Sequence, residues 1–576
     1  MNGGTITARA LQENGVRHLF TLCGGHIAPV YVEAERAGIR VIDVRHEATA
    51  VFAADAMARL GGIPGVAVVT AGPGVTNSVT ALKNAQMAQS PVILIGGATA
   101  TLLRGRGALQ DIDQTSILHS VVKWSARIGR VREIGPALRE AFRRSVSGVP
   151  GPVFIECPVD LLFDESTVRQ WYGQNDKPRR NLAERLQRWY IGRHLDRAFA
   201  GSDHTGMLKA EIPVPAAFSD GAVRKALDQI RRAERPVLIA GSGVMMIPGA
   251  AAGIAAAIRQ LNIPTFLSGM ARGLLGAKDP VQLLHQRKKA LREADCILLA
   301  GLPADFRLDY GRQLNRRAFK IAINRRAPDL KKNLSPDLAV HGDPGQFLAA
   351  LARQREADLP EWNDWKKTLT RYHEEREQEI AAMTAADTDG INPLTLFRAL
   401  ENQMPDNSVI IADGGDFAAT ASYTLSPRKP LSWLDPGVFG TLGVGGGFAL
   451  AAALQYPDDY IWIIYGDGSA AYSLAEFDTF TRHGMKVCAI IGNNGSWEQI
   501  ARDQKTMLGA ATATELPQSD YQRIAEAFGA AGERVETLEA FIASVARAIA
   551  SMDKGIPYVI NAVIGKSEFR KGSISI

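Results

Sequence analysis

Short apolar runs alternate with helix-length amphipathic segments in the first part of the chain. A helix is expected at 5–15, and glycine or proline bounds most of the apolar runs that follow it. These runs are 18–22, 39–44, 66–70, 92–95 and 153–156. Strands that alternate with helices indicate a parallel sheet with helices on both faces. The pattern therefore predicts an α/β domain over residues 1–165.

The same alternation returns twice further along the chain. A second region, 216–352, contains apolar runs at 236–240, 296–300 and 319–323. A third region, 390–576, contains runs at 408–412, 461–465, 487–491 and 558–564. We therefore expect an α/β protein with three doubly wound parallel-sheet domains. The pattern also favours, weakly, a shared topology for the first and third domains.

Two polar segments separate these domains. Residues 166–215 are expected to form a linker with one amphipathic helix, and residues 353–389 a charged, helical connector.

Composition narrows the class of protein. The net charge of +6 and the pI near 9.0 are a mild basic excess for 576 residues, and no block of five or more like charges occurs. These features argue against a nucleic-acid partner and allow an anionic small-molecule substrate. The four cysteines are widely spaced, and neither a signal pattern nor a long apolar stretch is present. We expect a cytoplasmic protein with no membrane segment.

Polar turns follow two neighbouring apolar runs in the third domain. Gly466-Asp467-Gly468-Ser469 follows the run at 461–465, and Gly492-Asn493-Asn494-Gly495 follows the run at 487–491. Ligands bind at the carboxyl ends of parallel strands, where glycines let backbone N–H groups approach a phosphate. Asp467 and Asn494 would offer oxygen ligands to a hard divalent ion. Each motif alone is an ordinary tight turn; the two together at strand ends favour a site.

This pair resembles the GDG–NN signature of thiamine-diphosphate enzymes, and the chain is similar to that family over nearly its whole length. The resemblance implies a pyrimidine-binding, a central and a pyrophosphate-binding domain, in that order. It implies Mg²⁺ on Asp467, Asn494 and the carbonyl of Ser496. The residues that it implies around the thiamine diphosphate are Gly414, Gly415, Asp416, Gly440, Leu442, Gly466, Gly468, Ser469 and Trp497. Leu442 stands where the family often has methionine, a change that conserves volume.

The segment that begins Arg45-His46-Glu47 resembles the family's helix with its catalytic glutamate. Small apolar residues follow Glu47, so we expect the carboxyl to be at least partly buried, with a raised pKa. The resemblance implies that Glu47 hydrogen-bonds the aminopyrimidine ring and so activates the cofactor. The alternative is an acid that only complements the positive end of a helix dipole.

Two polar residues are candidates for contact with the substrate. Gly107-Ala108-Leu109-Gln110-Asp111 resembles a stretch of acetolactate-synthase-like enzymes whose glutamine faces the reacting carbon, which makes Gln110 a catalytic candidate. His26 ends the first apolar run and is either an acid–base group or a satisfied loop histidine. Gln110 is alternatively a surface loop residue.

Longer matches point to the acetolactate-synthase-like branch of 2-hydroxyacyl-CoA lyases. They include 269–276, 433–437, 476–480 and 569–576. The resemblance implies reversible cleavage of a 2-hydroxyacyl-CoA to formyl-CoA and an aldehyde or ketone. Arg287, Arg325, Arg570 and Lys571 are candidates for the CoA phosphates, or are parts of a solvated basic face. The tail with Arg570 and Lys571 is also a candidate lid.

Three other functions stay open at this point. They are acetolactate synthase, oxalyl-CoA decarboxylase and a non-catalytic paralogue. Asn494 is followed by Gly-Ser-Trp-Glu, unlike the run usual in acetolactate synthases, and the joint presence of Glu47, Asp467 and Asn494 argues against the paralogue. The resemblance implies a homodimer or homotetramer, with the cofactor between two subunits. Chain-length and aldehyde preference, reaction direction, and whether the central domain binds ADP or CoA are not determined by the sequence.

Overall fold

The computed structural model describes residues 2–174, 182–202, 206–214, 217–354 and 359–570. The chain divides into two compact units. The first comprises residues 1–58 and 63–214, and the second comprises residues 59–62 and 215–576. The first unit contains one sheet and the second unit contains two. Lys571 lies outside the described residues.

The sheet of the first unit is parallel and six-stranded, in the order β2-β1-β3-β4-β6-β5. Its strands are β1 (His18–Thr21), β2 (Arg40–Asp43), β3 (Gly65–Val69), β4 (Val92–Ala98), β5 (Trp124–Arg127) and β6 (Val153–Pro158). Strands β3, β4 and β6 are buried along their whole length. Such continuous burial is expected when helices cover both faces of a parallel sheet.

Helices pack on this sheet through their apolar stripes. They are α1 (Gly3–Glu13), α2 (Ala28–Arg36), α3 (Glu47–Gly61), α4 (Pro73–Thr76), α5 (Val79–Ala88), α6 (Gln114–Leu118), α7 (Ile134–Val146), α8 (Val159–Leu162), α9 (Glu165–Trp171) and α10 (Leu182–Phe199). Helix α1 begins at a good N-cap, because the side chain of Asn2 accepts a hydrogen bond from the Thr5 N–H over 2.7 Å. Glu47 begins α3.

The second sheet is also parallel and six-stranded, in the order β12-β11-β10-β7-β8-β9. Its strands are β7 (Pro236–Ala240), β8 (Thr265–Leu267), β9 (Gln282–Leu283), β10 (Cys296–Ala300), β11 (Phe319–Asn324) and β12 (Leu338–His341). The order reverses between β7 and β10, as in doubly wound nucleotide-binding sheets. Its helices are α11 (Asp220–Arg232), α12 (Ala251–Leu261), α13 (Arg287–Glu293), α14 (Ala327–Leu330) and α15 (Pro344–Gln354).

The third sheet has the order β14-β13-β15-β16-β18-β17. Its strands are β13 (Ser408–Ala412), β14 (Trp433–Leu434), β15 (Tyr460–Gly466), β16 (Val487–Asn493), β17 (Ala531–Val535) and β18 (Tyr558–Val563). Numbered from its own first strand, this order is the same as that of the first sheet, so the two domains share one topology. All pairs in the three sheets are parallel, which confirms the predicted fold class.

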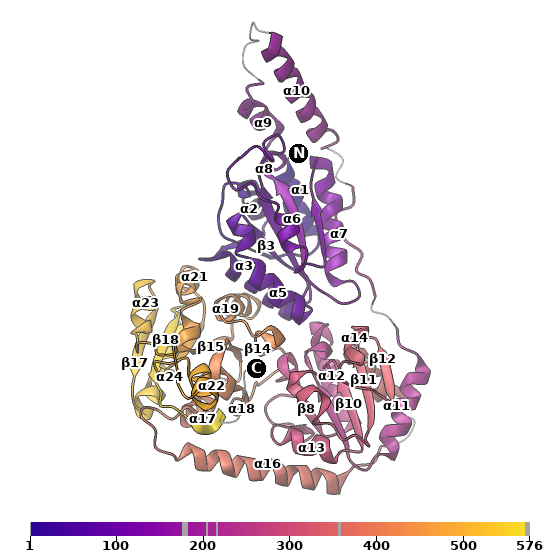
Figure 1. Ribbon diagram of the computed structural model, residues 1–576, viewed down its shortest axis with the longest axis vertical. Coiled ribbons are helices and arrows are strands. Elements are labelled where there is room, and N and C mark those ends of the chain that lie inside the picture. Colours follow the sequence, from indigo (N-terminus) through magenta and orange to yellow (C-terminus); the bar gives the residue numbers. More distant parts are fainter. Residues whose placement is uncertain (1, 175–181, 203–205, 215–216, 355–358, 571–576) are drawn as a thin grey trace. The chain divides into compact units, whose positions relative to one another are not determined.

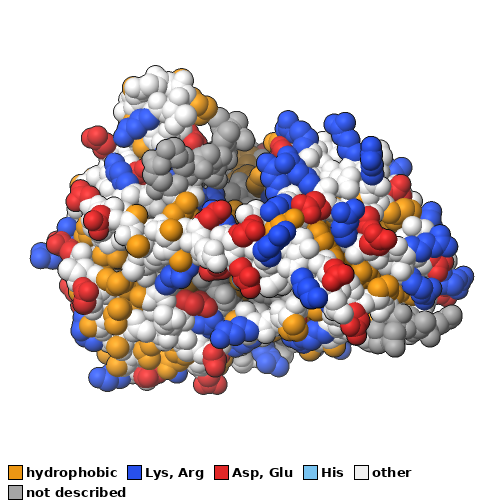
Figure 2. Space-filling view, turned by 90° about the horizontal axis from the view of Figure 1, so that it is seen from below, with side chains coloured by type: hydrophobic (Ala, Val, Ile, Leu, Met, Phe, Trp, Pro, Cys, Tyr) orange, Lys and Arg blue, Asp and Glu red, His pale blue; other side chains and the backbone are white. Residues whose placement is uncertain are grey.

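Helices also cover the third sheet, and one long helix connects it to the second. The covering helices are α17 (Pro393–Gln403), α18 (Gly415–Thr424), α19 (Val444–Gln455), α20 (Asp467–Ala470), α21 (Phe477–Arg482), α22 (Glu498–Leu508), α23 (Tyr521–Ala527) and α24 (Leu538–Met552). The connector is α16 (Asn363–Thr384), which runs along one side of the second unit (Figure 1). Acidic and basic side chains are interspersed on the face that carries α16 (Figure 2).

The segments between the domains agree in part with the expectation from sequence. Among the described residues, the connector at 353–389 contains α16 and the C-terminal end of α15. The linker at 166–215 contains α10, and α9 also extends into it, where one helix was predicted. Among the described residues, no helix combines the length and the apolarity needed to cross a membrane.

Candidate functional site

The two polar turns leave the third sheet from neighbouring strands. Strands β15 and β16 are paired with Gly466 opposite Gly492, so Asp467 and Asn494 follow the same edge of the sheet. Asp467 is the first residue of α20 and is buried. Its Oδ1 accepts a hydrogen bond from the Gly468 N–H over 2.8 Å, and its Oδ2 accepts one from the Ser496 N–H over 3.2 Å. The fold therefore brings the predicted metal residues Asp467, Asn494 and Ser496 together.

Burial raises the pKa of Asp467 above the usual range of an aspartate, and backbone hydrogen bonds oppose that shift. These bonds come from Gly468, Ser496, Gly495 and Asn494. A carboxylate that is held by several N–H donors, yet partly desolvated, keeps a strong tendency to pair with a cation. A hard divalent ion would supply that charge.

The two adjacent asparagines have different surroundings. Asn493 is buried in β16, and its Nδ2 donates to the Ser519 carbonyl and to Oδ1 of Asn561, each over 3.1 Å. Asn493 is therefore part of the sheet. Asn494 follows the strand and is half-buried, beside the Ser496 backbone. This division of roles agrees with the sequence-based choice of Asn494 as the metal ligand.

Some glycines among the predicted cofactor residues stand where a side chain would collide with a neighbour. A Cβ on Gly414 would lie 2.3 Å from Cδ2 of Leu442, and a Cβ on Gly468 would lie 2.5 Å from the indole ring of Trp497. Gly440 has φ of 66°, a left-handed conformation that glycine adopts without strain. The predicted cofactor residues therefore converge on one surface of the third sheet. The contacts of this surface fit a group that carries a diphosphate and an ion.

Buried Asp413 fixes the loop that carries Leu442. Its Oδ1 accepts a hydrogen bond from the Gly443 N–H over 3.0 Å, and its Oδ2 accepts one from the Gly445 N–H over 2.6 Å. Burial raises the pKa of Asp413 to about 7, although both hydrogen bonds act to lower it. Asp413 directly follows β13, so it ties this loop to the end of a core strand.

The remaining predicted cofactor residues lie on the same turns. Ser469 donates from Oγ to the Gly466 carbonyl over 3.0 Å, and Gly415 begins α18 with φ of 87°. The carboxylate of Asp416 forms two hydrogen bonds of 2.9 Å with the guanidinium of Arg502. Because this side chain is paired, Asp416 can contribute to a cofactor only through its backbone.

In the first unit, Glu47 lies at the start of α3 and is 7% exposed. Its Oε2 accepts a hydrogen bond from Nδ2 of Asn77 over 3.0 Å. A Cβ on Gly74 would lie 3.6 Å from Oε1, in ordinary contact. One carboxyl oxygen therefore has a fixed partner, while glycine leaves space beside the other.

Gln110 and His26 lie at the same edge of the first sheet. Nδ1 of His26 is 3.3 Å from Oγ1 of Thr70, which follows β3. Gln110 has φ of 61°, and its Cβ would be 2.9 Å from a Cβ on Gly72. Burial lowers the pKa of His26, so this imidazole is neutral near pH 7. Glu47, His26 and Gln110 thus all lie near the residues that follow β3.

Arginines from separate segments of the second unit gather around Tyr423 in α18. Arg287 donates from Nη2 to the Arg307 carbonyl over 2.6 Å. Burial lowers the pKa of Arg287, and so do the nearby charges of Arg272 and Arg307, while Tyr423 and Asp305 raise it. Arg570 lies on the other side of this group, with its guanidinium 5.2 Å from the Tyr423 ring centre. Asp305 pairs with Arg307 at 2.7 Å, and Asp416 lies 3.8 Å from Arg570, so carboxylates offset part of this positive charge. The remaining excess of arginines favours an anionic ligand.

The other two candidates for CoA binding are Arg325 and Lys571. Arg325 is buried and paired with Asp343, with its Nη2 2.6 Å from Oδ2, so a carboxylate already neutralises its charge. Lys571 lies outside the described residues.

Several residues of these sites were not singled out from the sequence. Asn77, Asp413 and Tyr423 each become notable only through a partner that is distant in the chain. Asp413 is buried directly after β13, and a polar residue at the end of an apolar run was the available signal for it. Asn77 follows α4 and is exposed, so the sequence offered no such signal for it.

Comparisons with known proteins agree with this geometry. Three family models match the chain: the N-terminal TPP binding domain of thiamine pyrophosphate enzymes at 1–117, the central domain at 223–351 and the C-terminal TPP binding domain at 413–562. The chain is 45% identical to 2-hydroxyacyl-CoA lyase 2 of Danio rerio and 44% identical to that of Homo sapiens. These alignments cover 100% of this chain and 93% and 92% of the two relatives.

A relative with lower sequence identity is named as an acetolactate synthase. The large subunit of acetolactate synthase of Mycobacterium tuberculosis is 31% identical over 98% of this chain and 96% of its own length. Both sets of relatives align with all three domains, and the family models match the domains that contain the two groups of site residues. The chain therefore belongs to the thiamine pyrophosphate enzyme family.

Proposed function

We propose that this protein is a thiamine-diphosphate-dependent 2-hydroxyacyl-CoA lyase. It reversibly cleaves a 2-hydroxyacyl-CoA to formyl-CoA and an aldehyde or ketone. The observation that carries the proposal is identity of 44–45% with lyases over the full chain, against 31% with acetolactate synthases. The arginine group around Tyr423 supports a substrate with phosphates.

Each group of residues has a stated role in this proposal. Bound thiamine diphosphate supplies an electron sink for the carbon–carbon bond that breaks. Asp467, Asn494 and the Ser496 carbonyl hold its Mg²⁺, and Glu47 holds a proton at the aminopyrimidine ring. Gln110 orients the substrate oxygen by a hydrogen bond, and neutral His26 accepts a proton from the substrate hydroxyl in the cleavage direction; such acid–base help is worth roughly 10²–10⁴ in rate.

The assembly and the compartment are further parts of the proposal. We expect at least a homodimer, in which Glu47 of one copy serves the diphosphate site of the other. Light scattering of the purified protein measures this directly, and a monomer with full activity would refute it. We also expect a reducing, cytoplasmic compartment, because Cys23, Cys157, Cys296 and Cys488 are all free thiols.

The central test is incubation with formyl-CoA and a series of aldehydes, in the presence of thiamine diphosphate and Mg²⁺. Mass analysis is expected to find 2-hydroxyacyl-CoA esters. The Glu47→Gln variant should make none while it still binds cofactor, whereas Glu33→Gln, in an ion pair with Arg36, should stay active. Acetolactate formed from pyruvate, without acyl-CoA products, would overturn the assignment.

A second test addresses the arginine group. Arg287→Met removes one of the clustered charges, and Arg292→Met removes an exposed charge from the same helix. The first variant should raise KM for the CoA substrate by roughly 10-fold, as expected for loss of a charge-assisted hydrogen bond. The second should leave KM unchanged. Equal KM values for both variants would remove the CoA role from Arg287.

A further inference from the structure

Three side chains with metal-ligating atoms meet away from the cofactor residues. His285 lies between β9 and α13, and His373 and Glu377 lie one turn apart on α16. Each residue offers one ligand atom, and these three atoms lie within 4.8 Å of one another. The residues come from the central domain and from the connector helix, so sequence spacing alone does not reveal the cluster.

The contacts of the cluster leave one buried nitrogen without a partner. Nε2 of His285 is 2.7 Å from Oε1 of Glu377, and the His285 side chain is 3% exposed. Nδ1 of His373 is buried and has no hydrogen-bond partner among the described residues. An unsatisfied buried polar atom is unfavourable, because it has lost its hydrogen bonds to water. A ligand on Nδ1 would remove that penalty.

The donor set is suited to a particular class of ion. Two imidazoles and one carboxylate, with a fourth position left open, form a set that binds zinc and similar divalent ions. Mg²⁺ prefers oxygen ligands only, as at Asp467 and Asn494.

We propose that His285, His373 and Glu377 bind one divalent transition-metal ion of the zinc class. The ion takes the place of the hydrogen between Nε2 of His285 and Oε1 of Glu377, and that hydrogen moves to Nδ1 of the same ring. The proposal is independent of the lyase activity.

Binding requires small changes at these side chains. Ligand atoms of a tetrahedral zinc ion are about 3.3 Å apart, somewhat closer than here. The two imidazole rings stack with centres 5.1 Å apart and planes at 11°, so the His373 ring turns about its Cβ–Cγ bond to face the ion. Arg398 contacts Oε2 of Glu377 at 3.4 Å and leaves Oε1 to the metal.

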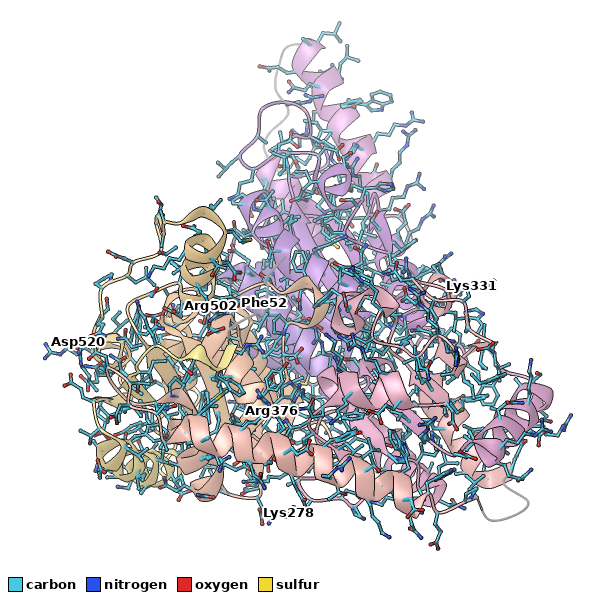
Figure 3. The ribbon with its side chains drawn as sticks, turned by 60° about the horizontal axis from the view of Figure 1, so that its bottom comes forward. Phe52, Lys278, Lys331, Arg376, Arg502 and Asp520 are labelled. Carbon is cyan, nitrogen blue, oxygen red and sulfur yellow. The ribbon has the colours of Figure 1, made fainter. Side chains whose placement is uncertain are left out.

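The ion would join the central domain to the connector. Arg376, which directly precedes Glu377, lies on α16 (Figure 3). Its guanidinium is 5.5 Å from the ring centre of Phe569, in the C-terminal segment. A metal at this point would therefore fix the part of α16 that supports that segment.

The test is calorimetric titration of the chelator-treated, full-length protein with Zn²⁺ alone, repeated with saturating thiamine diphosphate and Mg²⁺. We expect one Zn²⁺ per chain in both cases, and the absorption of a Co²⁺-loaded sample should show nitrogen ligation. His285→Asn, His373→Asn and Glu377→Gln should each weaken binding at least 10-fold. His341→Asn removes a histidine outside the cluster, which contacts the Arg325 carbonyl, and should not weaken binding.

The proposal fails if the three variants bind Zn²⁺ as the wild type does, because the bound metal is then an adventitious ion only. It also fails if no Zn²⁺ binds at micromolar concentration. A rise in thermal unfolding temperature with Zn²⁺ should occur in the wild type and in His341→Asn, and should be absent in Glu377→Gln. Because the Glu377 side chain is 41% exposed, this variant is expected to fold even if the histidine variants do not.

Discussion

Nδ2 of Asn77 donates a hydrogen bond to Oε2 of Glu47 over 3.0 Å. The bond joins the turn after α4 to the first residue of α3, so two separate helices determine where the carboxyl lies. A hydrogen bond to the ionised carboxylate favours the charged form. Asn77 is thus expected to position the Glu47 carboxyl.

Replacement of Asn77 should change the pH dependence of catalysis. Asn77→Ala removes a bond of about 1.5–3 kcal/mol to a charged group, so kcat is expected to fall about 10- to 100-fold. Asn77→Asp places a second carboxylate beside Glu47 and should move the acidic limb of the kcat profile to higher pH. Cofactor affinity and unfolding temperature serve as controls. A profile identical to that of the wild type would show that Asn77 has no effect on Glu47.

Gly414→Ala should weaken cofactor binding, and a second substitution should restore it. The added methyl would lie 2.3 Å from Cδ2 of Leu442 and would displace that side chain from its place among the predicted cofactor residues. Leu442→Ala removes the colliding atoms, so Gly414→Ala/Leu442→Ala should bind thiamine diphosphate more tightly than Gly414→Ala alone. Titration followed by tryptophan fluorescence measures both affinities. Additive losses in the double variant would contradict the steric explanation.

Asp413 should make stability depend on pH in a defined direction. Its pKa is raised from 3.8 to about 7 in the folded protein, so the folded state binds its proton more tightly than the unfolded state does. The stability that it contributes is complete below about pH 4 and is lost as the pH rises toward 7. In Asp413→Asn, the fall in unfolding temperature between pH 5 and 7 should be smaller. An equally steep fall would assign this pH dependence to other groups.

Removal of the C-terminal segment should affect the CoA substrate selectively. Phe569 packs edge-to-face on Tyr423, and Nε of Arg570 is 3.8 Å from Oδ1 of Asp416. Truncation after Lys566 removes these contacts and should raise KM for acyl-CoA roughly 10-fold, with little change in KM for the aldehyde. Steady-state kinetics with each substrate varied in turn measure the two KM values. An unchanged KM for acyl-CoA would exclude a lid function.

The central strands of all three sheets were predictable from the sequence, and most of the edge strands were not. Strands such as β4 and β13 are buried along their length, so they appear as continuous apolar runs. Strands β5, β9, β12, β14 and β17 lie at sheet edges, and β8 lies beside one. Most of these are partly exposed or only two to four residues long, and β17 carries both Glu533 and Arg534. These strands are defined by pairing with a neighbouring strand, and their own sequence carries no clear hydrophobic pattern.

The site was predictable where a short motif carried all of its information. Asp467 and Asn494 follow apolar runs directly, and the pairing of β15 with β16 brings their turns together. The group around Tyr423 was not predictable, because Arg287 and Arg570 reach it from segments far apart in the chain. Arg325 also precedes a basic residue in the sequence but is paired with Asp343, which only the fold reveals.

The first and third sheets share one strand order, and each presents candidate residues where its strands end. The first sheet carries Glu47, the proposed proton-exchanging acid, and the third carries the proposed ligands for phosphate and metal. Such a recurrence is what duplication of a single ancestral gene segment would leave behind. On that view two copies of one ancestral domain have diverged, and each has acquired one of the two proposed sets of site residues.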